Sequence, residues 1–290
     1  MDERFVVITP ARNEADYLEQ TIKSVVSQTI LPSEWIIVDD GSRDKTALIA
    51  EKASQAHPWI KVVRLEDRGY RDLYCVLVVD VIYEGIKNID ADYEFLFNID
   101  ADIVLSPDYF EIILNTLRAN PKLGIASGVV YEKFRGKLIK MKGLSWPTSG
   151  AIKCWRRKCF EEIGGLVRGL AWEVLDCFRA LMLGWQTQAF EDERLKVIHL
   201  RLEGSADQRI FHKFVRRGRS HHFMASHPLW LLATAFYHMQ ERPYILGGVG
   251  IIIGYLEAIL ERSKQLWDHE LKRYLRKWQI KKLTQILRLR

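Results

Sequence analysis

The sequence predicts an α/β fold built on a doubly wound parallel sheet, a Rossmann-like arrangement. Over the first 200 residues short apolar runs alternate with amphipathic helical patterns, and three of the runs end in clusters of polar residues. Strands that alternate with helices at this spacing form parallel sheets. Ligands of such sheets bind beyond the carboxyl ends of the strands, which is where the polar clusters fall.

Each element follows from its own local pattern. The apolar runs predict strands at 5–9, 35–38, 60–65 and 93–99. Apolar residues at helical spacing predict helices beginning near residue 18 and over 46–56 and 73–86, and Asp16 can cap the first of them. Two further strands are expected at 124–131 and 150–155.

The composition is that of a globular chain. Its 290 residues are 48% hydrophobic and 28% charged, which excludes a disordered tail, a collagen-like fibre and a disulfide-stapled miniprotein. The four cysteines form no C-x-x-C pair and are expected to be reduced thiols, typical of a cytoplasmic protein. The first residues lack the design of a secretory signal.

Charge divides the chain into two domains, a body over 1–204 and a helical region over 205–290. From residue 201 onward 17 Lys and Arg stand against 7 Asp and Glu, whereas the preceding 200 residues hold 26 against 30. A basic tail suits an anionic surface, either a membrane or a nucleic acid. Because no nucleic-acid recognition motif accompanies the charge, we expect a membrane and no nucleic acid.

Two segments of this tail favour partial embedding at the inner face of the cell membrane. Residues 244–256 carry no charge but are too few to span a bilayer, and they suit an interfacial or buried helix. Residues 267–286 place Trp, Tyr, Leu and Ile near one helical face and Lys and Arg over the rest. Such a helix can lie on an anionic membrane or dock on its own domain, and both alternatives stay open.

The sharpest local motif is Asp100-Ala101-Asp102, which directly follows an apolar run. Two carboxylates on alternate residues can reach one hard divalent cation. The letters Asn-Ile-Asp-Ala-Asp occur twice, at 88–92 and 98–102, and we favour the second copy because a buried strand precedes it. The Asp39–Ser42 cluster suits either a turn or recognition of a base or ribose.

Together, Thr9–Glu14, Val38–Thr46 and Asp100–Asp102 resemble the family 2 glycosyltransferases of the GT-A fold, with matching order and spacing over roughly residues 5 to 200. The resemblance implies transfer of a sugar from a nucleotide-sugar to an acceptor hydroxyl or phosphate, with inversion at the anomeric carbon. It implies a nucleotide site lined by Pro10, Ala11, Arg12 and Glu14, with Asp39 on the base and Asp100 on the ribose and diphosphate. It also implies that Asp100, Asp102 and His199 hold Mg²⁺ or Mn²⁺.

The chemistry agrees with this assignment. A nucleoside diphosphate leaves poorly until its developing charge is neutralised, which a divalent cation does directly. Arg71 is a candidate for a second clamp on the diphosphate, or else a solvated loop residue.

The general base is the least defined part of the site. An inverting transferase needs a carboxylate to accept the proton of the acceptor hydroxyl. Alignment on Arg179 and Gly184 puts Glu173 at the family's base position, and Asp176 is the fallback. A second register leaves Val174 there, which would fit an acceptor that needs no base, such as a lipid phosphate.

The resemblance also places the acceptor side around Gly150, with Trp146 and Trp172 as candidate contacts, and implies a lipid-linked or saccharide acceptor in cell-envelope polysaccharide synthesis. A degenerate transferase that only binds nucleotide-sugars is the main alternative. Sugar nucleotidyltransferases are disfavoured because the loop over 10–14 contains no glycine. A homo-oligomer stays open.

Overall fold

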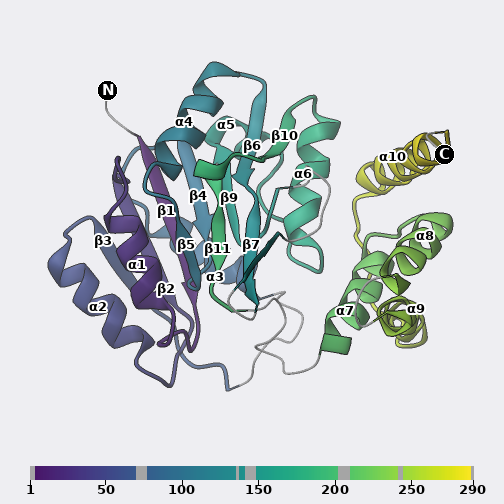
Figure 1. The fold of residues 1–290 in the computed structure, drawn as a ribbon, viewed down its shortest axis with the longest axis horizontal. Helices are drawn as coiled ribbons and strands as arrows, with labels where there is room; N and C mark the ends of the chain where they lie inside the picture. The colour runs from purple at the N-terminus through teal and green to yellow at the C-terminus, as the bar shows by residue number, and fades with distance from the viewer. Residues whose placement is uncertain are drawn as a thin grey trace. The chain divides into compact units, whose positions relative to one another are not determined.

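A computed structural model gives the structure of the chain and describes residues 4–69, 77–134, 137–140, 148–201, 210–240 and 244–288. The chain divides into two compact units (Figure 1). The first consists of Met1–Asp72, Leu77–Val167 and Glu173–Glu203. The second consists of Leu73–Val76, Arg168–Trp172 and Gly204–Arg290.

The first unit is built on a seven-stranded sheet with the order β10-β6-β9-β4-β1-β2-β3. Its strands are β1 (Phe5–Ala11), β2 (Glu34–Asp39), β3 (Ile60–Arg64), β4 (Phe95–Ile99), β6 (Leu123–Gly128), β9 (Ile152–Arg156) and β10 (Gln186–Phe190). The predicted parallel pairing is correct for β4, β1, β2 and β3. The sheet as a whole is mixed, because β9 runs antiparallel to both β4 and β6.

Helices cover both faces of this sheet, as a doubly wound fold requires. They are α1 (Leu18–Val26), α2 (Thr46–Ala56), α3 (Val78–Lys87), α4 (Tyr109–Ala119), α5 (Arg157–Glu162) and α6 (Trp172–Met182). Side chains alternate along a strand, so Val7 joins the core cluster shared with α1, α2 and α4 while Ile8 lies against α3 at Gly85. The α/β fold class predicted from the sequence is thereby confirmed.

Helix boundaries agree with the sequence patterns, with one correction. Helix α2 has the predicted bounds, and α3 lies within the predicted 73–86 segment except for its last residue, positions 73–76 being outside the described residues. The prediction that Asp16 caps α1 is wrong, because no side chain caps this helix. The carbonyl of Glu14 instead accepts from the backbone N–H groups of Tyr17 and Leu18.

A second, four-stranded sheet lies beside the first, with the order β5-β11-β7-β8. Its strands are β5 (Ile103–Leu105), β7 (Val130–Phe134), β8 (Lys137–Lys140) and β11 (Val197–His199), the last preceded by a 3-10 turn, η1 (Glu193–Leu195). The single strand predicted over 124–131 is wrong, because its two halves belong to different sheets. The break follows Gly128, where an added Cβ would lie 1.9 Å from the carbonyl oxygen of Leu195.

The second unit is helical throughout its described residues: α7 (Ile210–Phe223), α8 (Pro228–Met239), α9 (Ile245–Leu260) and α10 (His269–Arg288). Helices α7 and α9 approach closely through glycines. A Cβ on Gly254 would lie 2.0 Å from the carbonyl oxygen of Val215, and one on Gly218 would lie 2.0 Å from that of Ile251. Among the described helices, none is both long and apolar enough to cross a membrane.

Helix α10 docks on its own unit along its first turns. Leu271 and Leu275 are buried. The Gln279 side chain accepts from the backbone N–H of His227 at 2.7 Å, and Trp278 packs edge-on against Trp230. Of the two alternatives for this basic helix, docking therefore describes the part of its apolar face around Leu271 and Leu275, whereas Trp267 and Ile286 are exposed.

Candidate functional site

The polar clusters predicted at one edge of the sheet lie together in the structure, because β4, β1 and β2 are parallel neighbours. Strand β1 ends in Pro10-Ala11, and the backbone N–H of Asp40, just past β2, donates to the carbonyl of Ala11 at 2.8 Å. The N–H of Asp100, just past β4, donates to the carbonyl of Ala151 at 2.9 Å. The three loops are thus tied to the strand ends.

The loops after β1 and β2 interlock through side-chain hydrogen bonds. The backbone N–H of Asn13 donates to Ser42 Oγ at 2.9 Å, and that of Arg43 donates to Asn13 Oδ1 at 2.8 Å. Asn13 has a φ of 55°, a region that asparagine tolerates better than most residues. Asp39 is buried and its Oδ1 accepts from the N–H of Ser42 at 3.1 Å, which fixes this carboxylate at the strand end.

Arg12 is held by acidic partners at the same edge. Its Nη2 donates to Asp67 Oδ1 at 2.7 Å and its Nη1 donates to the carbonyl of Asp40. Hydrogen bonds to its carboxylate lower the pKa of Asp67 well below its usual range. The largest effect comes from the N–H of Gly69, and smaller ones come from Arg43 and Arg12. Asp67 was not predicted as part of the site, since no local motif surrounds it in the sequence.

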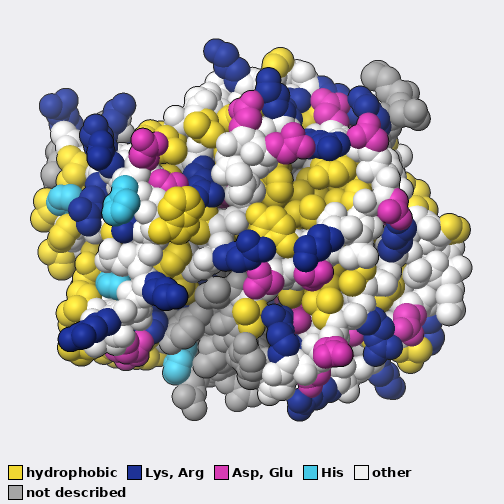
Figure 2. Space-filling model, turned by 180° about the vertical axis from the view of Figure 1, so that it is seen from behind, with side chains coloured by type: hydrophobic (Ala, Val, Ile, Leu, Met, Phe, Trp, Pro, Cys, Tyr) yellow, Lys and Arg dark blue, Asp and Glu magenta, His cyan; other side chains and the backbone are white. Residues whose placement is uncertain are grey.

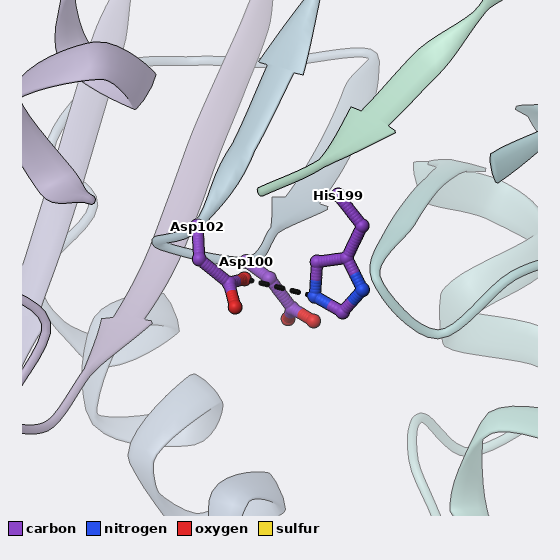
Figure 3. Close-up of side chains that lie close together, drawn as sticks. All are labelled: Asp100, Asp102 and His199. Carbon is purple, nitrogen blue, oxygen red and sulfur yellow. Dashed lines mark hydrogen bonds and ion pairs between the residues drawn. The ribbon is translucent and has the colours of Figure 1, made fainter. Parts of the chain in front are cut away.

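The centre of the site is a cluster of two carboxylates and an imidazole, Asp100, Asp102 and His199 (Figure 3). One ligand atom from each lies within 4.8 Å of the others. Strand β11 pairs antiparallel with β5, so that His199 stands opposite Ile103, directly after Asp102. The backbone N–H of Leu200 donates to the carbonyl of Asp102 at 2.9 Å, which ties the two segments together.

Burial and mutual charge set the protonation of this cluster. Burial and the neighbouring Asp102 raise the pKa of Asp100. Burial alone would also raise the pKa of Asp102, but its contacts with His199 and Arg201 outweigh burial and lower it. For His199 burial would lower the pKa, yet the hydrogen bond between its Nε2 and Asp102 Oδ1, 3.1 Å long, and the charges of Asp102 and Asp100 together outweigh burial and raise it.

An unpredicted residue, Arg201, joins the cluster to the loop after β1. Its Nε lies 2.6 Å from Asp102 Oδ2, and its Nη2 donates to Glu14 Oε1 at 2.5 Å. No local pattern in the sequence marks it, because its partners Asp102 and Glu14 lie far away along the chain.

The residues present fit a divalent cation. Carboxylate oxygens with one imidazole nitrogen are donors that Mg²⁺ and, more readily, Mn²⁺ accept. The separation of 3.1 Å between Asp102 Oδ1 and His199 Nε2 matches the roughly 3 Å between neighbouring ligands of an octahedral ion with bonds of about 2.1 Å. The carboxylates of Asp90 and Asp92, in the duplicate motif, instead pair with exposed Lys61, Arg4 and Arg157.

The two candidate bases lie in different surroundings. Glu173, in the first turn of α6, is half-buried. Asp176 is fully buried, with both carboxylate oxygens 3.0 Å from Lys153 Nζ and Oδ2 accepting from Trp155 Nε1 at 2.8 Å. A carboxylate enclosed by these donors cannot reach an acceptor hydroxyl, so the fallback assignment of Asp176 disagrees with the geometry.

The remaining predicted residues fall in three places. The carbonyl of Gly150 accepts from Asn98 Nδ2 at 3.4 Å, next to the carbonyl that binds the N–H of Asp100. Trp172 is buried at the start of α6. Arg71 and Trp146 lie outside the described residues.

Two solved structures have a similar fold. The mannosyltransferase PcManGT from Pyrobaculum calidifontis, in complex with GDP-Man and Mn²⁺, has a TM-score of 0.58 at 16% identity, covering 91% of this chain and 76% of that one. S. aureus TarS 1-349 in complex with UDP-GlcNAc has a TM-score of 0.54 at 18% identity, covering 69% and 59%. The expected GT-A fold is confirmed by these likenesses.

The chain belongs to glycosyl transferase family 2, because the sequence profile of that family matches residues 6–183. A poly-beta-1,6-N-acetyl-D-glucosamine synthase of Staphylococcus epidermidis is 35% identical over 201 residues, covering 62% of this chain and 45% of the relative. That of Staphylococcus aureus (strain MSSA476) is 30% identical over 116 residues, covering 40% and 26%. The chain therefore spans less than half the length of these relatives.

Proposed function

We propose that this chain is an inverting, cation-dependent glycosyltransferase that moves a sugar from a nucleotide-sugar to an acceptor. The observation that carries the proposal is the Asp100–Asp102–His199 cluster at the carboxyl edge of the sheet. Family membership supports the reaction class, and the Mn²⁺ named with the mannosyltransferase neighbour supports a divalent cation, either Mg²⁺ or Mn²⁺.

On the donor side, residues of three loops bind and orient the nucleotide. Asp39 contacts the base, Pro10 to Arg12 and Glu14 line the nucleotide, and Asp100 reaches the ribose and diphosphate. Asp100, Asp102 and His199 hold the cation, which when bound neutralises charge on the departing diphosphate. Arg71 acts as a further clamp on the diphosphate.

On the acceptor side, Glu173 is the general base. Its carboxylate takes the proton of the acceptor hydroxyl while the hydroxyl oxygen attacks the anomeric carbon and the bond to the diphosphate breaks, so the anomeric configuration inverts. Lys153 Nζ donates to the carbonyl of Glu173 at 2.6 Å, which supports a fixed position for the start of α6. Gly150, Trp146 and Trp172 shape the acceptor site.

The names of the relatives support an N-acetylglucosamine donor. UDP-GlcNAc is the ligand named with TarS, and the curated relatives are named as synthases of an N-acetylglucosamine polymer. A growing cell-surface glycan is then the first acceptor to test, and a lipid-linked sugar or lipid phosphate is the second.

The test is a donor screen that measures released nucleoside diphosphate with Mn²⁺ or Mg²⁺. Asp102→Ala and Glu173→Gln should each lower turnover at least about a hundredfold, as expected for a lost cation ligand or general base. Asp92→Ala, in the duplicate motif, is the matched control and should keep wild-type turnover. Nucleotide binding without any release would instead favour the degenerate, binding-only alternative.

We also propose that the second unit contacts the membrane, at its inner face, through α8 and α9. Large apolar side chains are exposed on both helices: Leu229, Leu232, Phe236, Tyr237, Ile245, Leu246, Ile253, Leu256, Ile259 and Leu260. Exposed Arg262, Lys264 and Trp267 follow α9 directly, a combination that suits an anionic headgroup region. At the left of Figure 2, hydrophobic side chains of this unit lie among Lys and Arg side chains.

A further inference from the structure

Arg201 is a cation that bridges the loop after β1 and the loop after β4. Its guanidinium contacts Asp102 from the loop after β4 and Glu14 from the loop after β1. The side chains of Glu14 and Asp102 are 9% and 3% exposed, and that of Arg201 is 22% exposed. The guanidinium also lies over the ring of Tyr17, with Cζ 5.4 Å from the centroid. These three contacts fix its position.

The contacts of Arg201 leave Asp102 with both oxygens engaged. Oδ1 faces His199 and Oδ2 faces Arg201. The guanidinium of Arg201 partly balances carboxylates that would otherwise repel one another at this edge, Asp100 among them. A divalent cation that binds to Asp100, Asp102 and His199 is therefore repelled by the guanidinium of Arg201, which contacts the carboxylate of Asp102.

A nucleoside diphosphate changes that balance. A diphosphate held between the cation and the loop after β1 would bring its negative oxygens toward Arg201, which contacts Glu14 of that loop. Guanidinium groups bind phosphate oxygens strongly and in defined directions. Arg201 repels the cation when the cation binds alone. It attracts the complex of cation and diphosphate, because the phosphate oxygens carry negative charge.

We infer that Arg201 is an internal counter-ion that couples binding of the divalent cation to binding of the nucleoside diphosphate. In the free protein it neutralises Asp102 and Glu14 and weakens binding of the cation alone. With the diphosphate present it strengthens binding of the pair. This inference rests on the proposed function, since it assumes a cation and a nucleotide at this edge.

The experiment is a binding cycle measured by calorimetry, with Mn²⁺ alone, UDP alone, and UDP at saturating Mn²⁺. Arg201→Gln should bind Mn²⁺ alone about tenfold more tightly, because the variant removes a fixed positive charge that contacts the same carboxylate. It should bind UDP with Mn²⁺ about tenfold more weakly, since a charged contact to phosphate is lost. Coupling between the two ligands should therefore fall.

Two variants serve as controls. Arg201→Lys keeps the charge and should restore most of the coupling, whereas Arg194→Gln removes an exposed arginine that pairs with Asp192 and should leave all three affinities unchanged. Circular dichroism establishes that each variant is folded.

The outcomes separate this inference from the proposed function. Unchanged coupling in Arg201→Gln, or weaker binding of Mn²⁺ alone, would overturn the counter-ion role, the latter because Arg201 would then only orient Asp102. If the wild-type protein binds neither Mn²⁺ with UDP nor Mn²⁺ with GDP, the proposed function itself is wrong.

Discussion

The buried pair of Lys153 and Asp176 is the strongest constraint on the acceptor side of the site. Both side chains are fully buried, and the ammonium also donates to the carbonyl of Glu173. Burial alone would lower the pKa of Lys153, but the neighbouring Asp176 and Cys177 outweigh burial and raise it. The role of the pair is to join β9 to the first turn of α6, where the candidate base lies.

Removing one partner should therefore cost more than removing both charges. Lys153→Met leaves a buried, unpaired carboxylate and should lower the free energy of unfolding of the first unit by about 3–5 kcal/mol. The double variant with Asp176→Asn removes both charges while keeping an acceptor for Trp155 Nε1, and should recover most of that loss. Urea denaturation measures both; equal losses in the single and double variants would contradict the pairing argument.

Residues of the site differ in how far the sequence reveals them. Asp100 and Asp102 could be predicted from the sequence because two carboxylates follow an apolar run at alternate positions. In the structure they lie close to His199. Arg201 and Lys153 were missed because their roles depend on distant partners. Arg201 pairs with Asp102, 99 positions earlier in the chain, and Lys153 pairs with Asp176, 23 positions later. An arginine or lysine carries no local sign that it will be buried against a carboxylate.

At the scale of elements, the contact between α7 and α9 depends on the absence of side chains. Gly254→Ala would raise intrinsic helix propensity by about 1 kcal/mol. We expect it to destabilise the second unit nonetheless, by about 1–3 kcal/mol, because its Cβ would lie 2.0 Å from a backbone oxygen of α7. Faster hydrogen exchange of α9 amides is the measurement.

The matched control is Ile253→Ala, one residue away on the exposed side of the same helix. It also raises helix propensity and places no new atom against α7, so exchange of α9 should change little. Slower exchange in Gly254→Ala would mean that the two backbones are not in close contact.

Elements whose cause is local were predicted, and those set by distant partners were not. The apolar runs that predict β1, β2 and β4 are contained in the strands' own residues. The same holds for the periodicity that predicts α2. The antiparallel direction of β9 is set by its pairing with β4, and the break at Gly128 by the close approach of Leu195. Both partners are distant in sequence, so no short stretch of sequence contains them. The same reason explains why α10 was an open choice: its apolar face suited a membrane as well as Trp230.

For the whole molecule, two surfaces of the second unit compete for the membrane. The basic face of α10 offers charge, while α8 and α9 offer apolar area. Leu246, Ile253, Leu256 and Leu260 follow one another at helical spacing along a single exposed stripe of α9. Each such side chain contributes about 1.5–3 kcal/mol when fully buried, against about 1 kcal/mol for each Lys or Arg near an anionic surface. The apolar stripe should therefore dominate.

Flotation with phosphatidylglycerol vesicles distinguishes these surfaces. The wild-type chain should float with the vesicles and stay bound in 1 M salt, which screens charge but not burial of apolar area. The combined variant Leu246→Glu, Ile253→Glu and Leu256→Glu should lose binding. The matched variant Arg273→Gln, Lys277→Gln and Lys281→Gln, on the exposed face of α10, should still float. The reverse pattern, with the glutamate variant bound and the glutamine variant released, would assign membrane contact to α10 instead.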